Sequence, residues 1–195
     1  SIHGNVRDFV RTNMEGVFNM LESVKESSFV KKFLQVSTDE VYGALSLSGG
    51  KKFNEKSLLL PNSPYAASKA SAVMLCRSYF ATWKIPIVVS RSSNNYGPFQ
   101  YPEKLIPYFV SRAMRNKTLP LYGDGKNVRD WVYVLDNCRA LELCLFKGRP
   151  GEVYNVGAGE EKSNLEIAST LLRHFNLDQS FLSFVDDRPG HDRRY

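Results

Sequence analysis

Strand-like and helix-like segments alternate along this chain, and that alternation constrains its fold more than any other feature. Apolar residues at helical spacing predict a long helix over residues 5–26, and Ser63 followed by Pro64 predicts the start of another over 63–83. Shorter helices are predicted at 103–115, 135–147 and 163–175. Short apolar runs predict strands at 31–37, 86–91, 119–122, 128–134, 153–156 and 181–185. Strands separated by helices pair in parallel, so we expect an α/β fold with a mainly parallel sheet.

Polar loops follow two of these predicted strands. Ser37-Thr38-Asp39-Glu40 follows the first strand, and residues 92–102 follow the second. Because sites in parallel sheets lie past the carboxyl ends of the strands, we expect the two loops to meet over one crevice. Neighbouring carboxylates in a dry crevice repel, so one can stay protonated while the other is ionised, which gives an acid and a base. The alternative is that Asp39 and Glu40 only cap a turn.

Tyr65 and Lys69 lie four residues apart in the predicted helix 63–83, so their side chains leave the same face of that helix. An ammonium group beside a phenol favours the phenolate, which predicts that Tyr65 is a base near neutral pH. The alternative is an ordinary Tyr and Lys on a half-exposed helix. Tyr65 and Lys69 follow Asp39 and Glu40 by about the length that a loop and the start of a crossover helix need. This position favours a functional role for the pair.

Further polar residues are suited to binding hydroxyl groups, amides or a small polyanion. Asn94 and Asn95 carry amides that can fix sugar hydroxyls or a carboxamide, although Asn and Gly are also turn formers. A small polyanion such as a nucleotide diphosphate needs only a few placed cations, and Tyr122 offers a surface on which a base can stack. The candidate cations are Lys104, Arg129, Arg188 and His191.

The net charge of +6 does not by itself indicate a nucleic-acid partner, because the basic residues occur in runs no longer than two. No apolar run approaches the ~20 residues of a membrane span, so we expect no membrane partner either. Cys76, Cys138 and Cys144 are expected to be reduced core thiols of a cytoplasmic protein. The methionines are expected to fill core space: Met14, Met20, Met74 and Met114.

Taken together, the motifs of this chain resemble those of one family. They are STDEVYG, SPYAASKA, SNNYGP, YPEKLIP, LPLYGDG, RDWVYV, YNVG and DRPGHDRRY, and they cover essentially the whole chain. The serine, tyrosine and lysine resemble those of the extended short-chain dehydrogenase/reductases that act on nucleotide sugars. The Asp-Glu pair and the last motif resemble, more narrowly, the dTDP-glucose 4,6-dehydratases.

The resemblance implies a three-stage dehydration of dTDP-glucose to dTDP-4-keto-6-deoxyglucose with bound NAD. Tyr65, with Lys69 beside it, would take the proton of the sugar C4 hydroxyl while NAD accepts the C4 hydride, and Thr38 would hydrogen-bond the C4 oxygen. Glu40 would then remove the C5 proton, Asp39 would protonate the departing C6 hydroxyl, and the hydride would return to C6.

The resemblance also implies binding residues and an assembly. The cofactor contacts would be Ser37, Tyr65, Lys69 and Asn95. The contacts to the dTDP-sugar would be Thr38, Asn94, Lys104, Leu105, Pro120, Tyr122, Arg129, Asn164, Arg188 and His191. No metal is expected. A homodimer would form through the helices at 5–26 and 63–83.

The family's opening unit, a strand and a GxxGxxG turn that hold the cofactor pyrophosphate at a helix N-terminus, has no match in residues 1–195. We therefore expect a partial Rossmann-like doubly wound parallel sheet lacking that glycine-rich unit, with a smaller α/β substrate-binding portion. The expected NAD-binding domain is 1–96 with 126–157, and the expected sugar-nucleotide domain is 97–125 with 158–195. Two alternatives stay open: another nucleotide-sugar enzyme (a UDP-glucose 4,6-dehydratase, an epimerase or a decarboxylase), and an inactive fragment that only binds sugar nucleotide.

Overall fold

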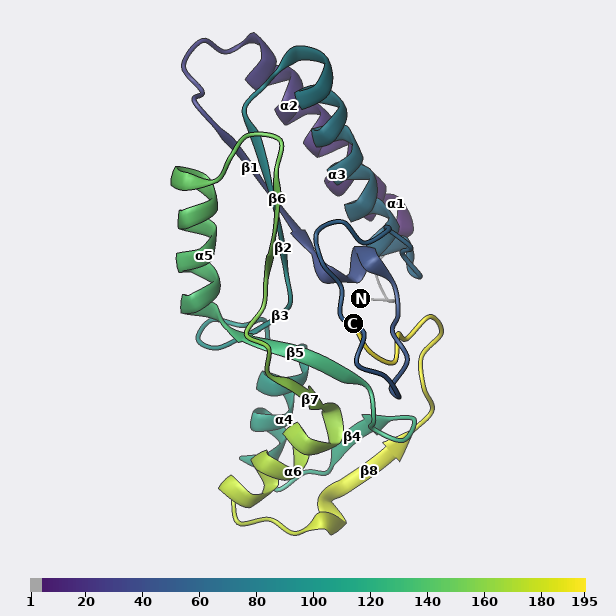
Figure 1. Ribbon diagram of the computed structural model, residues 1–195. Helices are drawn as coiled ribbons and strands as arrows, with labels where there is room; N and C mark the ends of the chain where they lie inside the picture. Colours follow the sequence, from purple (N-terminus) through teal and green to yellow (C-terminus); the bar gives the residue numbers. More distant parts are fainter. Residues whose placement is uncertain (1–4) are drawn as a thin grey trace.

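A three-stranded parallel sheet forms the centre of the upper half of the molecule in Figure 1. The computed structural model describes residues 5–195. The sheet has the order β1 (Phe33–Thr38), β2 (Ile87–Ser92), β6 (Val153–Val156), and all its pairs are parallel. Helices α2 (Gly16–Glu26) and α3 (Pro64–Trp83) lie on one side of it and α5 (Val134–Lys147) on the other. The predicted α/β class with parallel pairing is confirmed.

The helix predicted over residues 5–26 forms, but with a change of hydrogen bonding inside it. Asn5 accepts a hydrogen bond from the backbone N–H of Arg7 and caps α1 (Val6–Phe9), and α2 completes the run. Between them lies η1 (Val10–Glu15), which is π-helical. π-Helical turns are rare, and this one packs against α3, where the Asn13 amide donates to the Ser68 hydroxyl at 3.0 Å. Apolar periodicity does not distinguish a π turn from an α turn.

Helix α3 begins and ends as its sequence predicts. The Ser63 hydroxyl accepts from the Ala66 backbone N–H at 3.1 Å, and Pro64 occupies the first turn. Lys84 ends the helix in the left-handed conformation, with φ of 56°. Small residues let its buried face approach its neighbours closely: Ala66, Ser68, Ala70 and Ala72.

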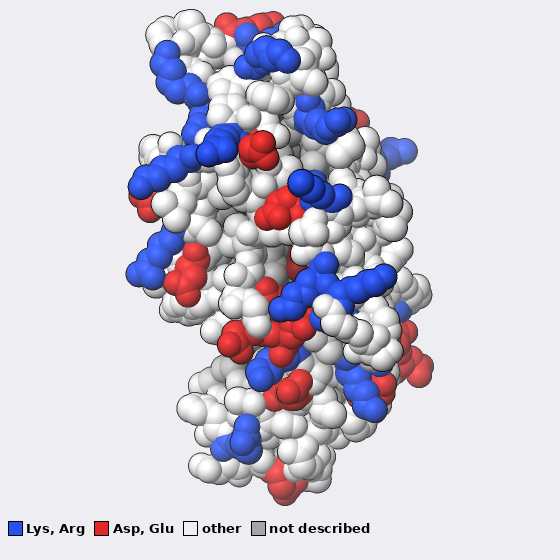
Figure 2. Space-filling model, viewed as in Figure 1, with Lys and Arg blue, Asp and Glu red and all other residues white. Residues whose placement is uncertain are grey.

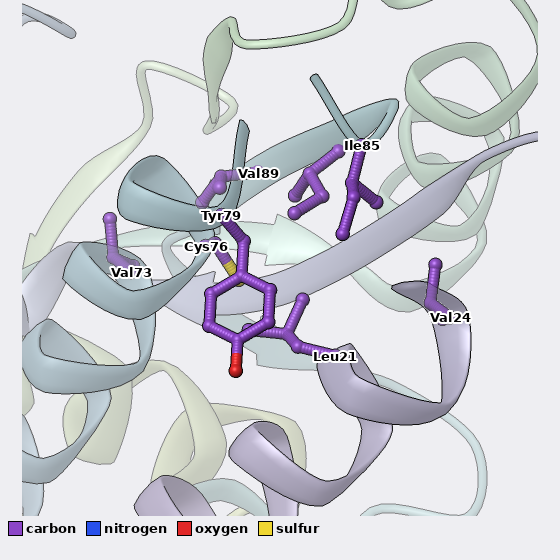
Figure 3. Close-up of a cluster of buried hydrophobic side chains, with 8 residues drawn as sticks. Leu21, Val24, Val73, Cys76, Tyr79, Ile85 and Val89 are labelled. Carbon is purple, nitrogen blue, oxygen red and sulfur yellow. The ribbon is translucent and has the colours of Figure 1, made fainter. Parts of the chain in front are cut away.

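One apolar cluster fixes α2 and α3 to the sheet (Figure 3). Leu21 from α2 meets Cys76 and Tyr79 from α3 over Ile87 and Val89 of β2. Leu21 and Cys76 are fully buried. This packing fixes the C-terminal half of α3 to the sheet, and the N-terminal turns of the same helix carry Tyr65 and Lys69.

The lower half of the molecule has its own apolar cluster. There β4 (Leu119–Tyr122) pairs in parallel with β8 (Leu182–Val185). The helices α4 (Leu105–Ala113) and α6 (Asn164–His174) cover this pair. The predicted capping box forms at the start of α6, where Ser163 and Glu166 bond reciprocally. The fully buried members of this cluster are Leu119, Leu121, Ala168 and Leu172.

A third small sheet links the two halves. Its order is β3 (Asn94–Tyr96), β5 (Val128–Tyr133), β7 (Glu161–Ser163), and the β5–β7 pair is antiparallel. The sequence did not predict β7, because Glu161-Lys162-Ser163 is short and polar. The remaining elements are the 3-10 helices η2 (Asp39–Tyr42) and η3 (Gln179–Phe181).

Some burial predictions are wrong. Cys76 and Cys144 are buried as expected, but Cys138 lies on the outer face of α5 and is exposed. Met20, Met74 and Met114 are also largely exposed rather than core residues. Helical location alone does not place a side chain inside, because each helix here is buried along one stripe only. Within residues 5–195, no helix has the length and apolarity needed to cross a membrane.

Replacing Leu21 by Ala tests the cluster that supports α3. Leu21 is 0% exposed, so we expect the free energy of unfolding to fall by about 2–5 kcal/mol. Met114 is 70% exposed, and Met114→Ala is expected to stay within about 0.5 kcal/mol of the parent. Urea unfolding of the three proteins measures both differences. Equal losses at positions 21 and 114 would contradict this assignment of the core.

Candidate active site

The register of β1 and β2 brings the two predicted loops together. Thr38, the last residue of β1, is paired with Ser92, the last residue of β2. The chain then turns into η2, where the Thr38 hydroxyl accepts from the Glu40 backbone N–H and donates to Asp39 Oδ1, both at 3.3 Å. The carboxylate pair therefore lies at the carboxyl end of the sheet, beside the loop that starts at Ser93.

Asp39 and Glu40 lie in different electrostatic environments. Burial, and then the neighbouring Glu40 carboxylate, raise the pKa of Asp39 to about 7, while Arg129 opposes the shift and Asp130 adds to it. Burial also raises the pKa of Glu40, and the guanidinium groups of Arg129 and Arg188 oppose that rise. Asp39 therefore keeps its proton up to about pH 7, well above the pH at which an ordinary Asp carboxyl loses it, and the protonated form is the state a general acid needs.

Tyr65 does not have the environment that its spacing from Lys69 predicted. The Lys69 ammonium donates to the Val36 carbonyl at 2.7 Å, and burial lowers the pKa of Lys69. Burial and the carboxylates of Glu40 and Asp39 raise the pKa of Tyr65 to about 12. Lys69 is not among the causes of this shift, because the carboxylates act on the phenol and the ammonium is held at the Val36 carbonyl of β1. That Lys69 favours the phenolate stays a prediction. The Tyr65 ring also contacts Phe9 edge-on, at 5.7 Å between centroids.

Two residues expected at the cofactor have buried oxygens that no described group satisfies. Ser37 Oγ and Asn95 Oδ1 have no hydrogen-bond partner within residues 5–195. The Asn95 amide nitrogen donates to the Ser93 carbonyl at 3.1 Å, which fixes the side chain. Asn94 and Asn95 belong to β3, paired with Trp131 and Val132 of β5. Unpartnered buried oxygens beside a strand end are suited to receiving a polar ligand.

Gly97 ends β3 at a point where the backbone admits no side chain. Its φ of +136° is unusual for residues other than glycine, and a Cβ there would lie 2.8 Å from Val134 Cγ1. Next to it, the Phe99 side chain is fully exposed. The Asn-Tyr-Gly-Pro segment is therefore a turn, and it also carries the side-chain amides of Asn94 and Asn95. The turn and the binding interpretation of this motif are compatible.

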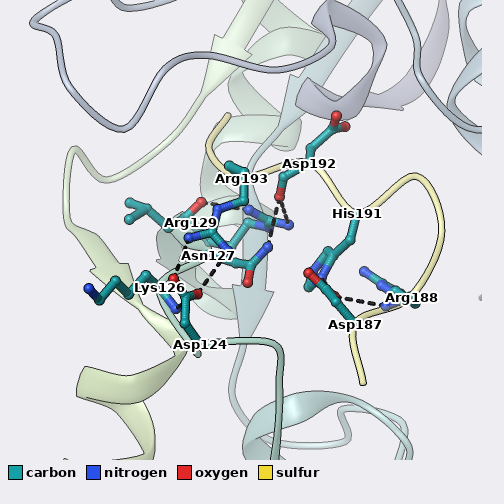
Figure 4. A network of polar contacts seen from close by, with 10 residues as sticks. Asp124, Lys126, Asn127, Arg129, Asp187, Arg188, His191, Asp192 and Arg193 are labelled. Carbon is teal, nitrogen blue, oxygen red and sulfur yellow. Dashed lines mark hydrogen bonds and ion pairs between the residues drawn. The ribbon is translucent and has the colours of Figure 1, made fainter. Parts of the chain in front are cut away.

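Arg129 is buried and held by its surroundings rather than projecting into solvent. Its guanidinium donates to the carbonyls of Val128 at 2.7 Å and Asp192 at 2.8 Å (Figure 4). It also lies 4.0 Å from the ring centroid of Tyr195. Burial, with Glu40 next, raises the pKa of Tyr195. Tyr195 is thus a member of this site that the sequence did not predict, although it closes the motif that supplied Arg188 and His191.

Residues 187–193 bring several predicted groups to one place. His191 Nδ1 and Asp187 Oδ1 are 2.7 Å apart, and the His191 ring meets Tyr122 edge-on at 6.1 Å. Arg193 binds Asp124 with both terminal nitrogens, at 2.8 and 2.9 Å, and so ties this segment to the turn after β4. Burial lowers the pKa of His191 in spite of the Asp187 carboxylate.

Other predicted contacts lie further from the carboxylate pair. Lys104 is half-exposed and 3.8 Å from Glu103, and Leu105 begins α4. Pro120 lies in β4, and Asn164 is buried at the first turn of α6, where its N–H donates to the Asn127 carbonyl. Within residues 5–195, no hydrogen bond or ion pair joins these four residues to Asp39 or Glu40.

Figure 2 shows how charge is distributed around this region. Lys and Arg side chains are spread over the visible face, and acidic side chains gather at the waist of the molecule. The basic surface is not concentrated in one stripe in this view, which agrees with the short basic runs in the sequence.

Comparison with known proteins agrees with this fold. The family model described as GDP-mannose 4,6 dehydratase matches residues 3–193. The low-salt glycan biosynthesis protein Agl12 of Haloferax volcanii is 47% identical over 98% of this chain, and a dTDP-glucose 4,6-dehydratase of an Actinoplanes species is 48% identical over 96%. The crystal structure of dTDP-glucose 4,6-dehydratase from Bacillus anthracis in complex with NAD superposes with a TM-score of 0.92, at 48% identity over 98% of this chain.

These proteins are longer than the chain described here. It covers 61% of Agl12, 57% of the Actinoplanes protein and 60% of the Bacillus anthracis chain. The parallel α/β fold with its tyrosine and lysine defines the class, the extended short-chain dehydrogenase/reductases. Within that class, the chain belongs to the dTDP-glucose 4,6-dehydratase family.

The raised pKa of Asp39 predicts a pH dependence of stability. The folded state holds the proton more tightly than the unfolded state, so the stabilising contribution is full below pH ~4 and is lost as pH rises through about 7. Asparagine does not ionise, so Asp39→Asn lacks this pH dependence. We expect the free energy of unfolding of the variant to equal that of the parent at pH 4 and to be larger than that of the parent at pH 8. The difference should be on the order of 1.4 kcal/mol for each pKa unit. Urea unfolding at both pH values measures it, and a difference that does not change with pH would contradict the shift.

Proposed function

We propose that the protein containing this chain converts dTDP-glucose to dTDP-4-keto-6-deoxyglucose, with NAD as its bound cofactor. The observation that carries the proposal is the half-buried carboxylate pair beside Tyr65, in which Asp39 has a pKa of about 7. Loss of water from a sugar needs an acid for the departing hydroxyl and a base for the carbon-bound proton. Oxidation at C4 alone needs only the tyrosine.

The residues present suit the cofactor. Ser37 Oγ and Asn95 Oδ1 are buried oxygens without a described partner, and Lys69 points at the end of β1. We propose that Ser37, Tyr65, Lys69 and Asn95 hold NAD. Bound there, NAD accepts the hydride from C4 and returns it to C6. The high pKa of Tyr65 calls for a nearby positive charge when it acts as a base, and Lys69 is the residue placed one helical turn away to supply it.

The protein's own groups then divide the proton transfers. Tyr65 takes the C4 hydroxyl proton, and the Thr38 hydroxyl donates a hydrogen bond to the C4 oxygen. The new ketone acidifies C5–H, which Glu40 removes as a carboxylate stabilised by Arg129 and Arg188. Asp39 gives its proton to the C6 oxygen, which departs as water. Glu40 exchanges its proton with solvent and finally protonates C5.

We propose that the nucleotide part of the substrate binds over the segment 187–193. Tyr122 and Pro120 would enclose the base, and Arg188, His191 and Arg129 would face the diphosphate. Asn94, Lys104, Leu105 and Asn164 complete the proposed contacts. The names of the relatives support this substrate, because dTDP-glucose 4,6-dehydratases are among the similar proteins.

The assembly and its domains follow the same reasoning. We propose that residues 1–96 and 126–157 belong to the NAD-binding domain and that 97–125 and 158–195 belong to the sugar-nucleotide domain. We also propose a homodimer through the helices at 5–26 and 63–83, because Phe18, Met20 and Met74 on these helices are exposed. Three free cysteines fit a cytoplasmic, reducing location.

The substrate assignment is tested with the polypeptide that carries these residues, supplied with either dTDP-glucose or UDP-glucose. We expect the 4-keto product from dTDP-glucose, measured by its keto-sugar absorbance, and a lower kcat/KM with UDP-glucose. A preference for UDP-glucose would move the assignment to the UDP-glucose 4,6-dehydratases. An epimerised or decarboxylated product would assign another reaction of the superfamily.

Glu40→Gln tests the division of roles between the carboxylates. The amide cannot accept the C5 proton, so we expect incorporation of solvent deuterium at C5 to fall by a factor of about 10² or more. Oxidation at C4 should continue, seen as NADH absorbance after substrate is added. Glu142→Gln, at an exposed position of α5, is the matched control and should leave both signals unchanged. Normal deuterium incorporation in Glu40→Gln would remove Glu40 from this role.

A further inference from the structure

A cavity of about 150 Å³ lies behind Asp39, at the carboxyl ends of β1, β2 and β6. Its wall includes Asp39, Ser93, Asp130, Asn155 and Tyr195. Within residues 5–195, neither Glu40 nor Tyr65 belongs to that wall. Of the three proton-transferring groups, Asp39 alone therefore lines the cavity.

The wall of this cavity contains polar atoms that suit water. Ser93 Oγ and Arg91 Nε are buried and have no hydrogen-bond partner among the described residues. Gly157 has no side chain there, which leaves room for the Asp130 carboxylate to approach beside Ser93. Buried polar atoms without protein partners are normally satisfied by ordered water, and each water takes a share of about 30 Å³ in the liquid. The volume is sufficient for several water molecules.

The cavity has a route to solvent. Lys52 and Phe53, from the loop between η2 and α3, form part of its wall, and Lys52 is exposed. A second hollow of about 450 Å³ under the same loop shares Tyr42, Leu45, Lys52 and Phe53 with the cavity. The two spaces are therefore neighbours, and Leu45 lies where they meet.

Counting the protons in one turnover of the proposed reaction shows why a route to solvent is needed. The C5–H bond breaks and its proton goes to Glu40, which exchanges it with solvent and later returns one proton to C5. The C6–O bond breaks, and the departing hydroxyl takes the proton of Asp39 and becomes water. The hydride moves from C4 to the cofactor and back to C6. At the end Tyr65 has gained one proton, Asp39 has lost one, and one water is free.

We propose that this cavity receives the released water and returns a solvent proton to Asp39 after each turnover. The inference rests on the proposed function and goes beyond it, because it assigns the step that resets the acid. Asp130 faces the cavity and places a negative charge near Asp39, which favours return of the proton. Thr38, Glu40 and Arg129 are the other polar groups that act on Asp39.

Substitutions that fill the cavity should slow the return of a proton to Asp39 without slowing the dehydration itself. Ser93→Val adds apolar volume to the wall and breaks no hydrogen bond of the hydroxyl that the structure shows. Ser90→Val is the matched control, because Ser90 lies in β2, is fully buried with an unpartnered hydroxyl, and is not part of the cavity wall. Leu45→Trp is a second variant that narrows the junction of the two spaces from an exposed loop.

The experiment is rapid-quench measurement of the 4-keto product from dTDP-glucose in the full-length protein. At about pH 6, below the pKa of about 7, Asp39 starts mostly protonated, so the first turnover of Ser93→Val and Leu45→Trp should proceed at the parent rate. The following turnovers should be about tenfold slower, giving a burst of one product per site. The parent and Ser90→Val should show no burst.

The possible failures are distinguishable. If the parent forms no keto product, the proposed function fails. If the parent is active and both cavity variants keep equal first and later rates, the cavity does not reset Asp39. A first turnover slowed as much as the later ones would also overturn the inference, because the substitution would then act on the chemistry itself.

Discussion

The parallel register that pairs Thr38 with Ser92 is the constraint on which the site depends. It places the end of β1 beside the end of β2, so that Asp39 and the loop after Ser93 share one edge of the sheet. Because that edge is covered by α3 on one side and by the C-terminal residues on the other, the carboxylates are only partly exposed to water. Desolvation is accordingly the largest cause of the raised pKa of both Asp39 and Glu40.

The last residues of the chain close this edge. The Asp192 carbonyl accepts from Arg129, and Arg194 binds Glu161 with two nitrogens at 2.7 and 3.0 Å while also donating to the carbonyls of Ser46 and Gly49. One buried arginine thus connects β7, the loop after η2 and the C-terminal segment. The same segment carries Arg188 and His191. The contacts that order the loops therefore also fix the positions of these two proposed substrate-binding cations.

The sequence predicted the parallel α/β class, most helix boundaries and the grouping of Asp39 and Glu40 with the second loop, because periodicity, caps and strand ends are local signals. It did not predict the direction in which Lys69 points, since that depends on the distance from α3 to the Val36 carbonyl. It also missed Tyr195, whose role comes from a long-range contact with Arg129. The strand β7 was missed because its pairing with β5, rather than its own three polar residues, makes it a strand.

The π-helical segment at Val10–Glu15 has a consequence for how this helix can vary. A π turn contains one residue more than the α turn it replaces, and each residue of an α-helix rotates the chain by about 100°. Deleting one residue within 10–15 would remove that extra residue and leave Phe9 on its present face against the Tyr65 ring. Returning the segment to regular α bonding at its present length would instead turn Phe9 and the rest of α1 about a quarter of the way round the axis. The π bonding therefore accommodates one additional residue without moving the contact between Phe9 and Tyr65, so a single-residue deletion should be tolerated best where hydrogen bonding is least regular.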